Sequence, residues 1–231
     1  MLSLRTTAAT PAVLSIVSAV ALLLRLVALL FVKPGRFRVF STGVQVSASQ
    51  LLSLPQWIGK RFATVNKHVL RQYGTHSDGD KKTIPEVWSD DRYYIQSGVN
   101  VELGVEANPL LGMLMDRHAV LRFAVCILQT LFTVHTASVW INGKGGAVTE
   151  THFDSDHNLV LVLHGSCIFH TAPRSAFGPD VRDNMSTNTP GNSQFFTPHR
   201  MTSGQVAIQP GYMWHYVESS PHCVKIALFF S

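Results

Sequence analysis

The stretch Thr149-Glu-Thr-His-Phe-Asp-Ser-Asp-His-Asn158 carries the pattern on which the fold and the chemistry of this chain depend. His152 and Asp154 lie two positions apart in it. On a β-strand, residues two apart point to the same face, so the imidazole and the carboxylate would lie side by side. They are two of the three ligands of a 2-His-1-carboxylate site, which suits non-haem Fe(II). The third ligand would be His215, within Pro210-Gly-Tyr-Met-Trp-His-Tyr-Val-Glu-Ser219.

The sequence around this stretch is rich in short β-forming runs that alternate with Gly, Pro, Asn and Asp turns from Ala137 onward. Such spacing predicts an all-β barrel or sandwich. The expected strands are Ser138–Ile141, Thr149–Phe153, Leu159–Leu163, Cys167–His170, Gln205–Ile208, Tyr216–Glu218 and Val224–Phe230. Residues 174–203, rich in Pro, Asn, Ser and Thr, are expected to form a long irregular insert.

The part of the chain before Ala137 has a mixed pattern. Residues 33–48 are expected to form a linker with a possible strand, and residues 49–73 a helix, because apolar positions recur at roughly helical spacing. Asp91–Gln96 has the composition of a strand. Residues 110–134 predict one or two amphipathic helices that pack on the body. We therefore expect a linker and helical part over residues 33–90, followed by a barrel domain over residues 91–231.

The N-terminal segment is apolar and basic. Residues 12–32 are 21 residues with one charge, Arg25, which is long enough to cross a bilayer as a helix. Basic residues predominate after the segment, and this bias predicts a membrane anchor with the body on the cytoplasmic side. A cleaved secretory signal or a mitochondrial presequence remains the alternative.

The distribution of charge and the cysteine content argue against a nucleic-acid-binding protein and against a disulfide-stabilised one. The net charge is +5, but residues 1–77 hold nine Lys or Arg and no acid, so the basic excess belongs to the N-terminal third. No basic stripe interleaved with aromatic residues is present, and we expect no nucleic-acid partner. The three cysteines, Cys126, Cys167 and Cys223, form neither a CxxC motif nor a zinc-like spacing, which argues against a disulfide framework.

Two blocks resemble the JmjC and cupin-like 2-oxoglutarate dioxygenases. In residues 138–165, this family has a Thr three residues before the first metal-binding His, an Asn after the Asp, and a Gly that ends the next strand. Residues 203–219 resemble the family's Gly-Asp-x-x-x-x-Pro-x-Gly-Trp-Trp-His-x-Val strand with its distal His. The resemblance covers about residues 91–231, and it implies a cupin-type double-stranded β-helix, a jelly-roll relative, with helices packed outside it.

The resemblance also implies roles for individual residues. His152, Asp154 and His215 would bind Fe(II), and Thr149 would donate a hydrogen bond to a carboxylate of 2-oxoglutarate. Asn158 would lie behind the metal ligands or contact the co-substrate. Three protein ligands leave three octahedral positions, which suits a bidentate 2-oxo acid and dioxygen.

One position departs from the family pattern. Asparaginyl-hydroxylase-like members place a Lys 15 residues beyond the first His, where it pairs with the far carboxylate of 2-oxoglutarate, and here that position is Cys167. A neutral thiol cannot replace an ammonium group, and an unpaired carboxylate inside a barrel is costly. Lys225, ten residues after His215, is the candidate replacement, because prolyl-4-hydroxylase-like enzymes have a basic residue at about that spacing. Arg174 is a weaker alternative.

The sequence therefore predicts an Fe(II)- and 2-oxoglutarate-dependent oxygenase. The expected substrate is a protein side chain or another small polar molecule, by analogy alone. Two alternatives stay open because of Cys167. One is a cupin-like pseudoenzyme that keeps the metal triad for structure or binding, and the other is a metal-dependent cupin of different chemistry.

Overall fold

The computed structural model describes residues 36–66, 81–100, 109–149, 151–177 and 194–231. The predicted membrane segment, residues 12–32, lies outside these ranges, as does most of the predicted insert. Within the described ranges, no helix has both the length and the apolar character needed to cross a membrane.

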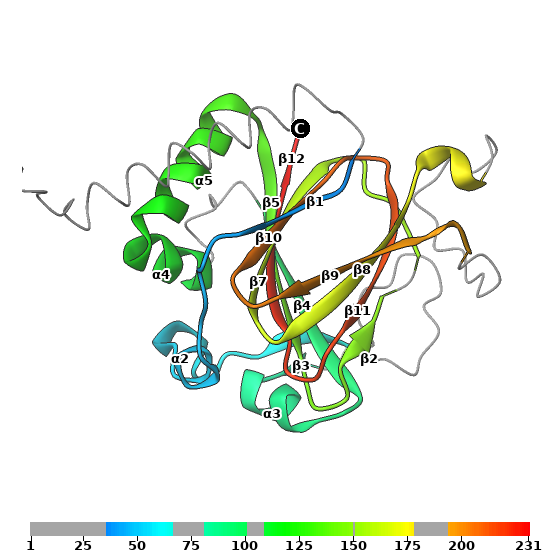
Figure 1. Cartoon of the computed structure of the whole chain (residues 1–231). Helices are drawn as coiled ribbons and strands as arrows, with labels where there is room; N and C mark the ends of the chain where they lie inside the picture. Colours follow the sequence, from blue (N-terminus) through cyan, green and yellow to red (C-terminus); the bar gives the residue numbers. More distant parts are fainter. Residues whose placement is uncertain (1–35, 67–80, 101–108, 150, 178–193) are drawn as a thin grey trace, which may run out of the picture.

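Two antiparallel sheets face each other to form the body (Figure 1). The larger sheet has the strand order β1-β10-β7-β12-β5-β4-β2-β3, and the smaller has the order β6-β11-β8-β9. The bounds of the larger sheet's strands are β1 Arg38–Ser41, β2 Phe62–Asn66, β3 Lys81–Lys82, β4 Tyr93–Asn100, β5 Val134–Asn142, β7 His157–His164, β10 Gln205–Gln209 and β12 Val224–Phe230. Those of the smaller sheet are β6 Ala147–Val148, β8 Ser166–Ala172, β9 Thr197–Thr202 and β11 Trp214–Ser219.

The chain passes back and forth between the two sheets from β5 to β12. Strands β5, β7, β10 and β12 belong to the larger sheet, and β6, β8, β9 and β11 to the smaller. Strands that alternate between two facing sheets build a jelly-roll barrel of the cupin type. The expected mainly β architecture is therefore confirmed, and all the expected C-terminal strands except the second correspond to strands of the structure.

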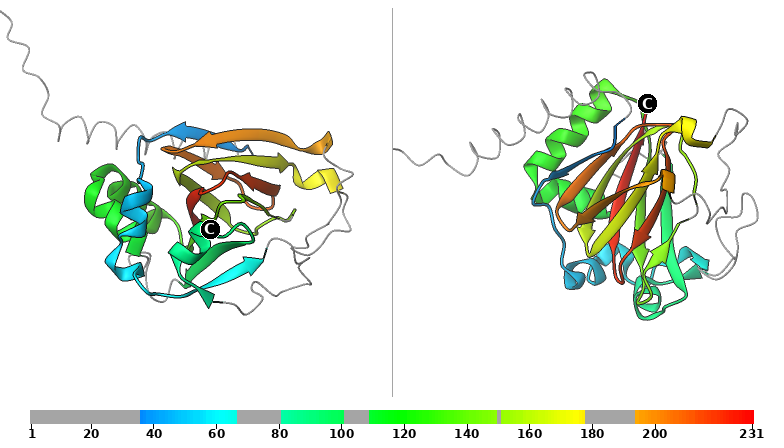
Figure 2. Two further views of the ribbon diagram at one scale, coloured as in Figure 1. Left: turned by 90° about the horizontal axis from the view of Figure 1, so that it is seen from below. Right: turned by 45° about the vertical axis from the view of Figure 1, so that its right-hand side comes forward.

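The helices cover the outer face of the larger sheet (Figures 1 and 2). They are α2 Ala48–Leu52, α3 Ile84–Ser89, α4 Pro109–Arg117 and α5 Ala119–Leu131, with the short 3-10 turn η1 Pro55–Trp57. A second 3-10 turn, η4 Arg174–Phe177, follows β8 of the smaller sheet and lies on the opposite side of the molecule from α4 and α5. Leu114 and Val125, from α4 and α5, share one buried cluster with Leu161 and Ile226 of the sheet. The expected helices over residues 110–134 are thus confirmed, with the last residue, Val134, starting β5.

Alternate residues of the same strands form a second core between the sheets. Val160 and Ala227 of the larger sheet pack there against Phe169 and Val217 of the smaller. Because side chains on a strand point alternately to the two faces, one face of β7 and β12 meets the helices and the other lines the barrel. Ala227, a small side chain in this core, also lines a cavity inside the barrel.

Three expectations for local structure were wrong. In the described part of the predicted helix over residues 49–73, which ends at Asn66, only α2 and η1 are helical, and Phe62–Asn66 is a strand that pairs with β4. Residues 67–73 lie outside the described ranges. The predicted strand Thr149–Phe153 is replaced by the two-residue β6 and an isolated bridge at His152. The predicted insert contains β9, which pairs with β8 along its whole length.

Candidate metal and co-substrate site

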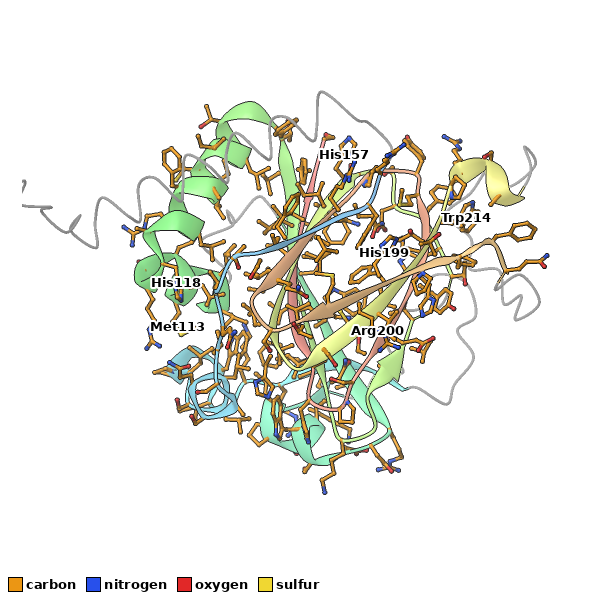
Figure 3. The ribbon with its side chains drawn as sticks, viewed as in Figure 1. Met113, His118, His157, His199, Arg200 and Trp214 are labelled. Carbon is orange, nitrogen blue, oxygen red and sulfur yellow. The ribbon has the colours of Figure 1, made fainter. Side chains whose placement is uncertain are left out.

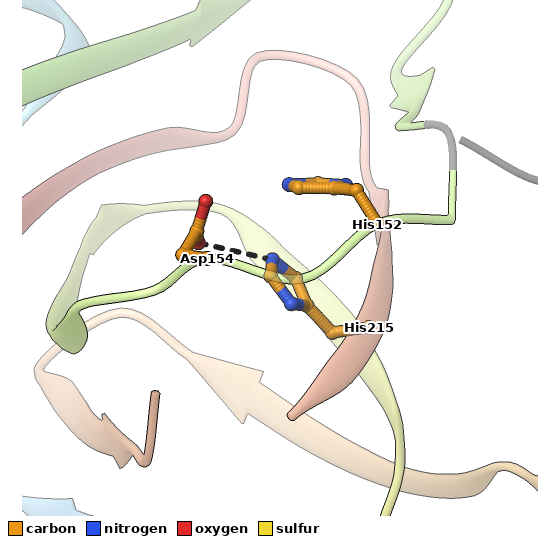
Figure 4. A group of neighbouring side chains, drawn as sticks. All are labelled: His152, Asp154 and His215. Atoms are coloured by element: carbon orange, nitrogen blue, oxygen red, sulfur yellow. Dashed lines mark ion pairs between the residues drawn. The ribbon is translucent and has the colours of Figure 1, made fainter. Parts of the chain in front are cut away.

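His152, Asp154 and His215 meet at one end of the barrel (Figure 4). One potential ligand atom from each residue lies within 4.8 Å of the other two. The Nε2 atom of His215 is 3.6 Å from Oδ2 of Asp154, and the two imidazole centroids are 4.2 Å apart. Two imidazoles and one carboxylate form the donor set that suits non-haem Fe(II), so the residues fit the metal that the sequence predicts.

Backbone pairing holds these ligands together. The N–H of His152 donates to the carbonyl of His215 at 3.0 Å, and the N–H of His215 donates back at 2.8 Å. The N–H of Tyr212 also donates to the carbonyl of Asp154 at 2.6 Å. Tyr212 adopts a φ of 60°, which lies in the left-handed region. The residue before it, Gly211, must be small. A side chain at Gly211 would collide with the carbonyl oxygen of Ser155.

His215 is buried and neutral. Burial and the nearby His152 ring lower the pKa of His215 well below its ordinary value. Its Nδ1 atom lies 3.1 Å from the carbonyl oxygen of Met213 and 2.8 Å from Nε2 of Gln209. These contacts occupy Nδ1 and leave Nε2, the atom that faces Asp154, for a metal ion.

A cavity of about 510 Å³, partly open to solvent, adjoins the three ligands. The cavity is lined by Trp140, Thr149, His152, Asp154, Asn158, Val160, Phe169, Gln209, His215, Val217, Lys225, Ala227 and Phe229. All six residues that the sequence predicts for the site are in this set, whereas Arg174 and the other described histidines are not.

Lys225 is a buried cation in the cavity wall. Its side chain is 4% exposed, and Nζ donates to Oγ of Ser219 at 2.7 Å. The Trp140 and Phe169 rings lie 5.6 and 5.9 Å from Nζ. Within the described ranges, no carboxylate pairs with Lys225. Aromatic faces and a hydroxyl stabilise an ammonium group without neutralising it, so the part of the wall around Lys225 carries a positive charge that an anion would balance.

Thr149 and Asn158 present polar groups to the same cavity. The Oγ1 atom of Thr149 accepts from the N–H of Val217 at 2.8 Å, so its hydroxyl proton can point elsewhere. The Nδ2 atom of Asn158 donates to Oδ2 of Asp154 at 2.6 Å, and this bond orients the carboxylate. Asn158 thus lies behind a metal ligand, one of the two places that the sequence analysis gives it.

Cys167 and Arg174, the two other positions considered in the sequence analysis, both lie in the described ranges. The Cys167 thiol is buried in the barrel core, and a hydrogen bond with Cys223, together with burial, raises the pKa of Cys167. Cys167 is therefore a neutral thiol and supplies no charge. Arg174 lies over the ring of Tyr212, 4.6 Å from its centroid.

Two polar residues that form hydrogen-bonding contacts with the predicted site residues are absent from the sequence-based site. Gln209 contacts His215, and Ser219 contacts Lys225. Gln209 precedes the Pro210-Gly turn, and Ser219 follows His215 by four residues on the same strand. Neither position has a sequence signal of its own, because each depends on cross-strand neighbours that only the fold brings together.

Comparison with known proteins places the fold. No protein-family profile and no curated protein sequence matches the chain. A crystal structure of Escherichia coli YcfD matches with a TM-score of 0.57 and 12% identity, over 89% of this chain and 52% of that one. The chain has the fold of YcfD. A second YcfD structure, described as a ribosomal oxygenase in complex with cobalt and 2-oxoglutarate, matches with a TM-score of 0.50 and 11% identity, over 85% and 48%.

The match confirms, at the level of the fold, the resemblance that the sequence predicts. The chain spans about half the length of the YcfD structures that it matches. At 11–12% identity the likeness extends to the fold of YcfD and not to its activity.

Proposed function

We propose that this chain is an Fe(II)- and 2-oxoglutarate-dependent oxygenase. His152, Asp154 and His215 would hold the iron, which when bound would supply the chemistry for oxidising a C–H bond of a substrate with dioxygen. The observation that carries the proposal is the position of Lys225, a buried cation without a carboxylate partner in the described ranges, in the wall of the cavity that the metal ligands line.

The charges of the cavity suit a dicarboxylate. Lys225 provides one positive position, and a divalent metal at the three ligands would provide another. A dianion with a carboxylate at each end would balance both, and 2-oxoglutarate has this form. The Thr149 hydroxyl adds a hydrogen-bond donor, and Trp140 and Phe169 surround the Lys225 ammonium group with apolar surface that excludes water.

For the substrate we propose a chemical class and not a particular molecule. The barrel would admit a protein side chain or another small polar group to the metal ligands. YcfD is described as a ribosomal oxygenase, and this analogy is the reason for putting a protein side chain first. Anchorage through residues 12–32 and a cytoplasmic orientation of the body stay predictions, since those residues lie outside the described ranges.

Cys167 supports one competing function, a pseudoenzyme that binds metal without turning over. One assay distinguishes the oxygenase from the pseudoenzyme. It measures the conversion of 2-oxoglutarate to succinate by the full chain, supplied with Fe(II) and air. The oxygenase proposal predicts slow succinate formation even without a second substrate, lost in His152→Ala and Lys225→Met and retained in Lys60→Met, a change at an exposed lysine. Iron binding without succinate formation under any condition would support the pseudoenzyme.

A further inference from the structure

Two amide side chains face each other inside the barrel. Asn158 on β7 and Gln209 on β10 are directly opposite in the antiparallel register. Both line the cavity, and they are 3% and 1% exposed. The Oδ1 atom of Asn158 and the Oε1 atom of Gln209 are buried and have no hydrogen-bond partner among the residues that the structure describes. Buried carbonyl oxygens that lack a hydrogen bond cost free energy, and native proteins rarely leave such groups unpaired.

The contacts of His215 identify the cause. Its Nδ1 atom lies 3.1 Å from the carbonyl oxygen of Met213, which can only accept a hydrogen bond. The same Nδ1 atom lies 2.8 Å from Nε2 of Gln209, an amide nitrogen that can only donate. One ring nitrogen cannot donate and accept at once. The contact with Met213 requires a proton on Nδ1, whereas the contact with Gln209 requires an unprotonated Nδ1.

A half turn of the Gln209 amide removes the conflict. The turn exchanges Oε1 and Nε2, which have nearly the same size, and needs no movement of the backbone. Nδ1 of His215 then keeps its proton and donates to Oε1 of Gln209 and to the Met213 carbonyl. The Nε2 group of Gln209 then occupies the position of Oε1 and offers a donor to Asn158, its cross-strand partner, whose Oδ1 atom lacks one in the described ranges.

We propose that Gln209 and Asn158 form an amide relay that joins two of the metal ligands. In the relay, His215 Nδ1–H donates to Gln209, Gln209 donates to Oδ1 of Asn158, and Asn158 donates to Asp154. The last of these bonds is present at 2.6 Å. The relay pairs both orphaned oxygens and fixes the His215 tautomer with an unprotonated Nε2 facing Asp154.

Gln209 is thereby a positioning residue for the metal ligands. It touches neither the metal nor the co-substrate in this account, and acts by holding the His215 ring and, through Asn158, the Asp154 carboxylate. The relay rests on the metal site of the proposed function but not on 2-oxoglutarate. The Met213 carbonyl can only accept a hydrogen bond, so it favours a proton on Nδ1 whether or not a metal is bound. The relay is therefore also present in the metal-free chain.

Metal affinity tests the relay without reference to activity. With Co(II) alone as the probe, Gln209→Leu is expected to bind 10–100-fold more weakly than the unaltered chain, the usual cost of losing an outer contact to a metal-binding His. Gln209→Glu, whose carboxylate can accept from Nδ1–H, is expected to recover a large part of this loss. Gln45→Leu, at an exposed glutamine, is the matched control and should bind as the unaltered chain does.

Two further results bear on the relay. If Asn158 and Gln209 act through one another, Asn158→Leu combined with Gln209→Leu weakens Co(II) binding by less than the product of the single effects. The relay would be overturned if Gln209→Glu bound Co(II) no better than Gln209→Leu. It would also be overturned if the double variant weakened binding by the full product of the two single effects.

Nitrogen NMR of the metal-free full chain gives an answer that does not depend on metal binding. The relay predicts that His215 carries its proton on Nδ1 and that the Gln209 side-chain amide protons contact Asn158. A proton on Nε2 of His215 would contradict the relay. A chain with the relay intact but no metal affinity would contradict the proposed function instead, so the two failures are distinguishable.

Discussion

The backbones of His152 and His215 exchange two hydrogen bonds, of 3.0 and 2.8 Å, across an isolated bridge at the end of the smaller sheet. Both imidazoles therefore project from paired main-chain segments, and Asp154 is fixed two residues further along by its own bond to Tyr212. Ligands that are held by the main chain need little reorganisation to receive an ion. The site is thus preorganised by the barrel before any metal is bound.

Metal binding by this chain depends on the three ligands. His152→Ala removes one imidazole from a three-ligand site and is expected to lower the affinity for Co(II), measured anaerobically by calorimetry, by at least about 100-fold, beyond the effect of outer contacts. His118→Ala is the matched control, because His118 lies at the α4–α5 junction, far from the smaller sheet (Figure 3). Equal affinity of both variants would mean that the ion binds elsewhere.

Lys225 is expected to matter for the co-substrate and not for folding. Lys225→Met leaves the far carboxylate of 2-oxoglutarate unpaired, which should weaken its binding to the metal-loaded chain by at least about 30-fold, the lower end for a lost buried charge pair. The metal-free variant should unfold at the same or a higher temperature, because a buried ammonium without a counter-ion is removed. A large loss of thermal stability would show that Lys225 serves the fold.

The cation can also be moved within the barrel. Cys167 belongs to the core cluster that includes Phe169 and Ala227, both of which line the cavity. It stands where the asparaginyl-hydroxylase-like dioxygenases that the sequence resembles have a Lys. Cys167→Lys in the Lys225→Met background should therefore recover part of the lost 2-oxoglutarate affinity, measured by the same calorimetric titration. No recovery in a variant that still binds Co(II) would separate position 167 from the far-carboxylate site.

The stability of the metal-free protein should depend on pH through His215. Burial lowers its folded-state pKa well below 6.5, whereas the unfolded chain takes up a proton near pH 6.5. Below that pH the unfolded state binds more protons, so the free energy of unfolding falls as the pH decreases and is level above it. His215→Leu should reduce the slope between about pH 5 and 6.5 by up to about 1.4 kcal/mol per pH unit in urea titrations. An unchanged slope would contradict the assigned burial effect.

The metal ligands could be predicted from sequence because their signal is local. A His and an Asp two residues apart, a Thr before them and an Asn after them lie in one ten-residue stretch, Thr149–Asn158, and the distal His stands in a second short block. Several strands of the barrel also have a local signal, because β7, β10 and β12 are short, mostly apolar runs that are buried along nearly their whole length. Lys225 could be proposed from its spacing after His215, although its burial and missing counter-ion emerge only from the fold.

The features that sequence reasoning missed depend on pairing between distant segments. Phe62–Asn66 has a helix-like apolar spacing, yet it pairs with β4, where Thr64 lies opposite Ile95. Strand β9 shows little hydrophobic alternation and has one buried residue, Met201, but β8 offers it a complete ladder. The contacts of Gln209 and Ser219 likewise arise across strands, so no local pattern marks them.

The central claim is that the metal ligands and Lys225 bind Fe(II) and 2-oxoglutarate together. Anaerobic addition of 2-oxoglutarate to the Fe(II)-loaded chain, followed by visible absorption, tests this most directly, because a 2-oxo acid chelated to the iron gives a weak charge-transfer band. The account predicts a band that saturates with 2-oxoglutarate, that is absent in His152→Ala, and that needs much more 2-oxoglutarate in Lys225→Met. Iron bound at the three ligands with no band at any 2-oxoglutarate concentration would contradict it.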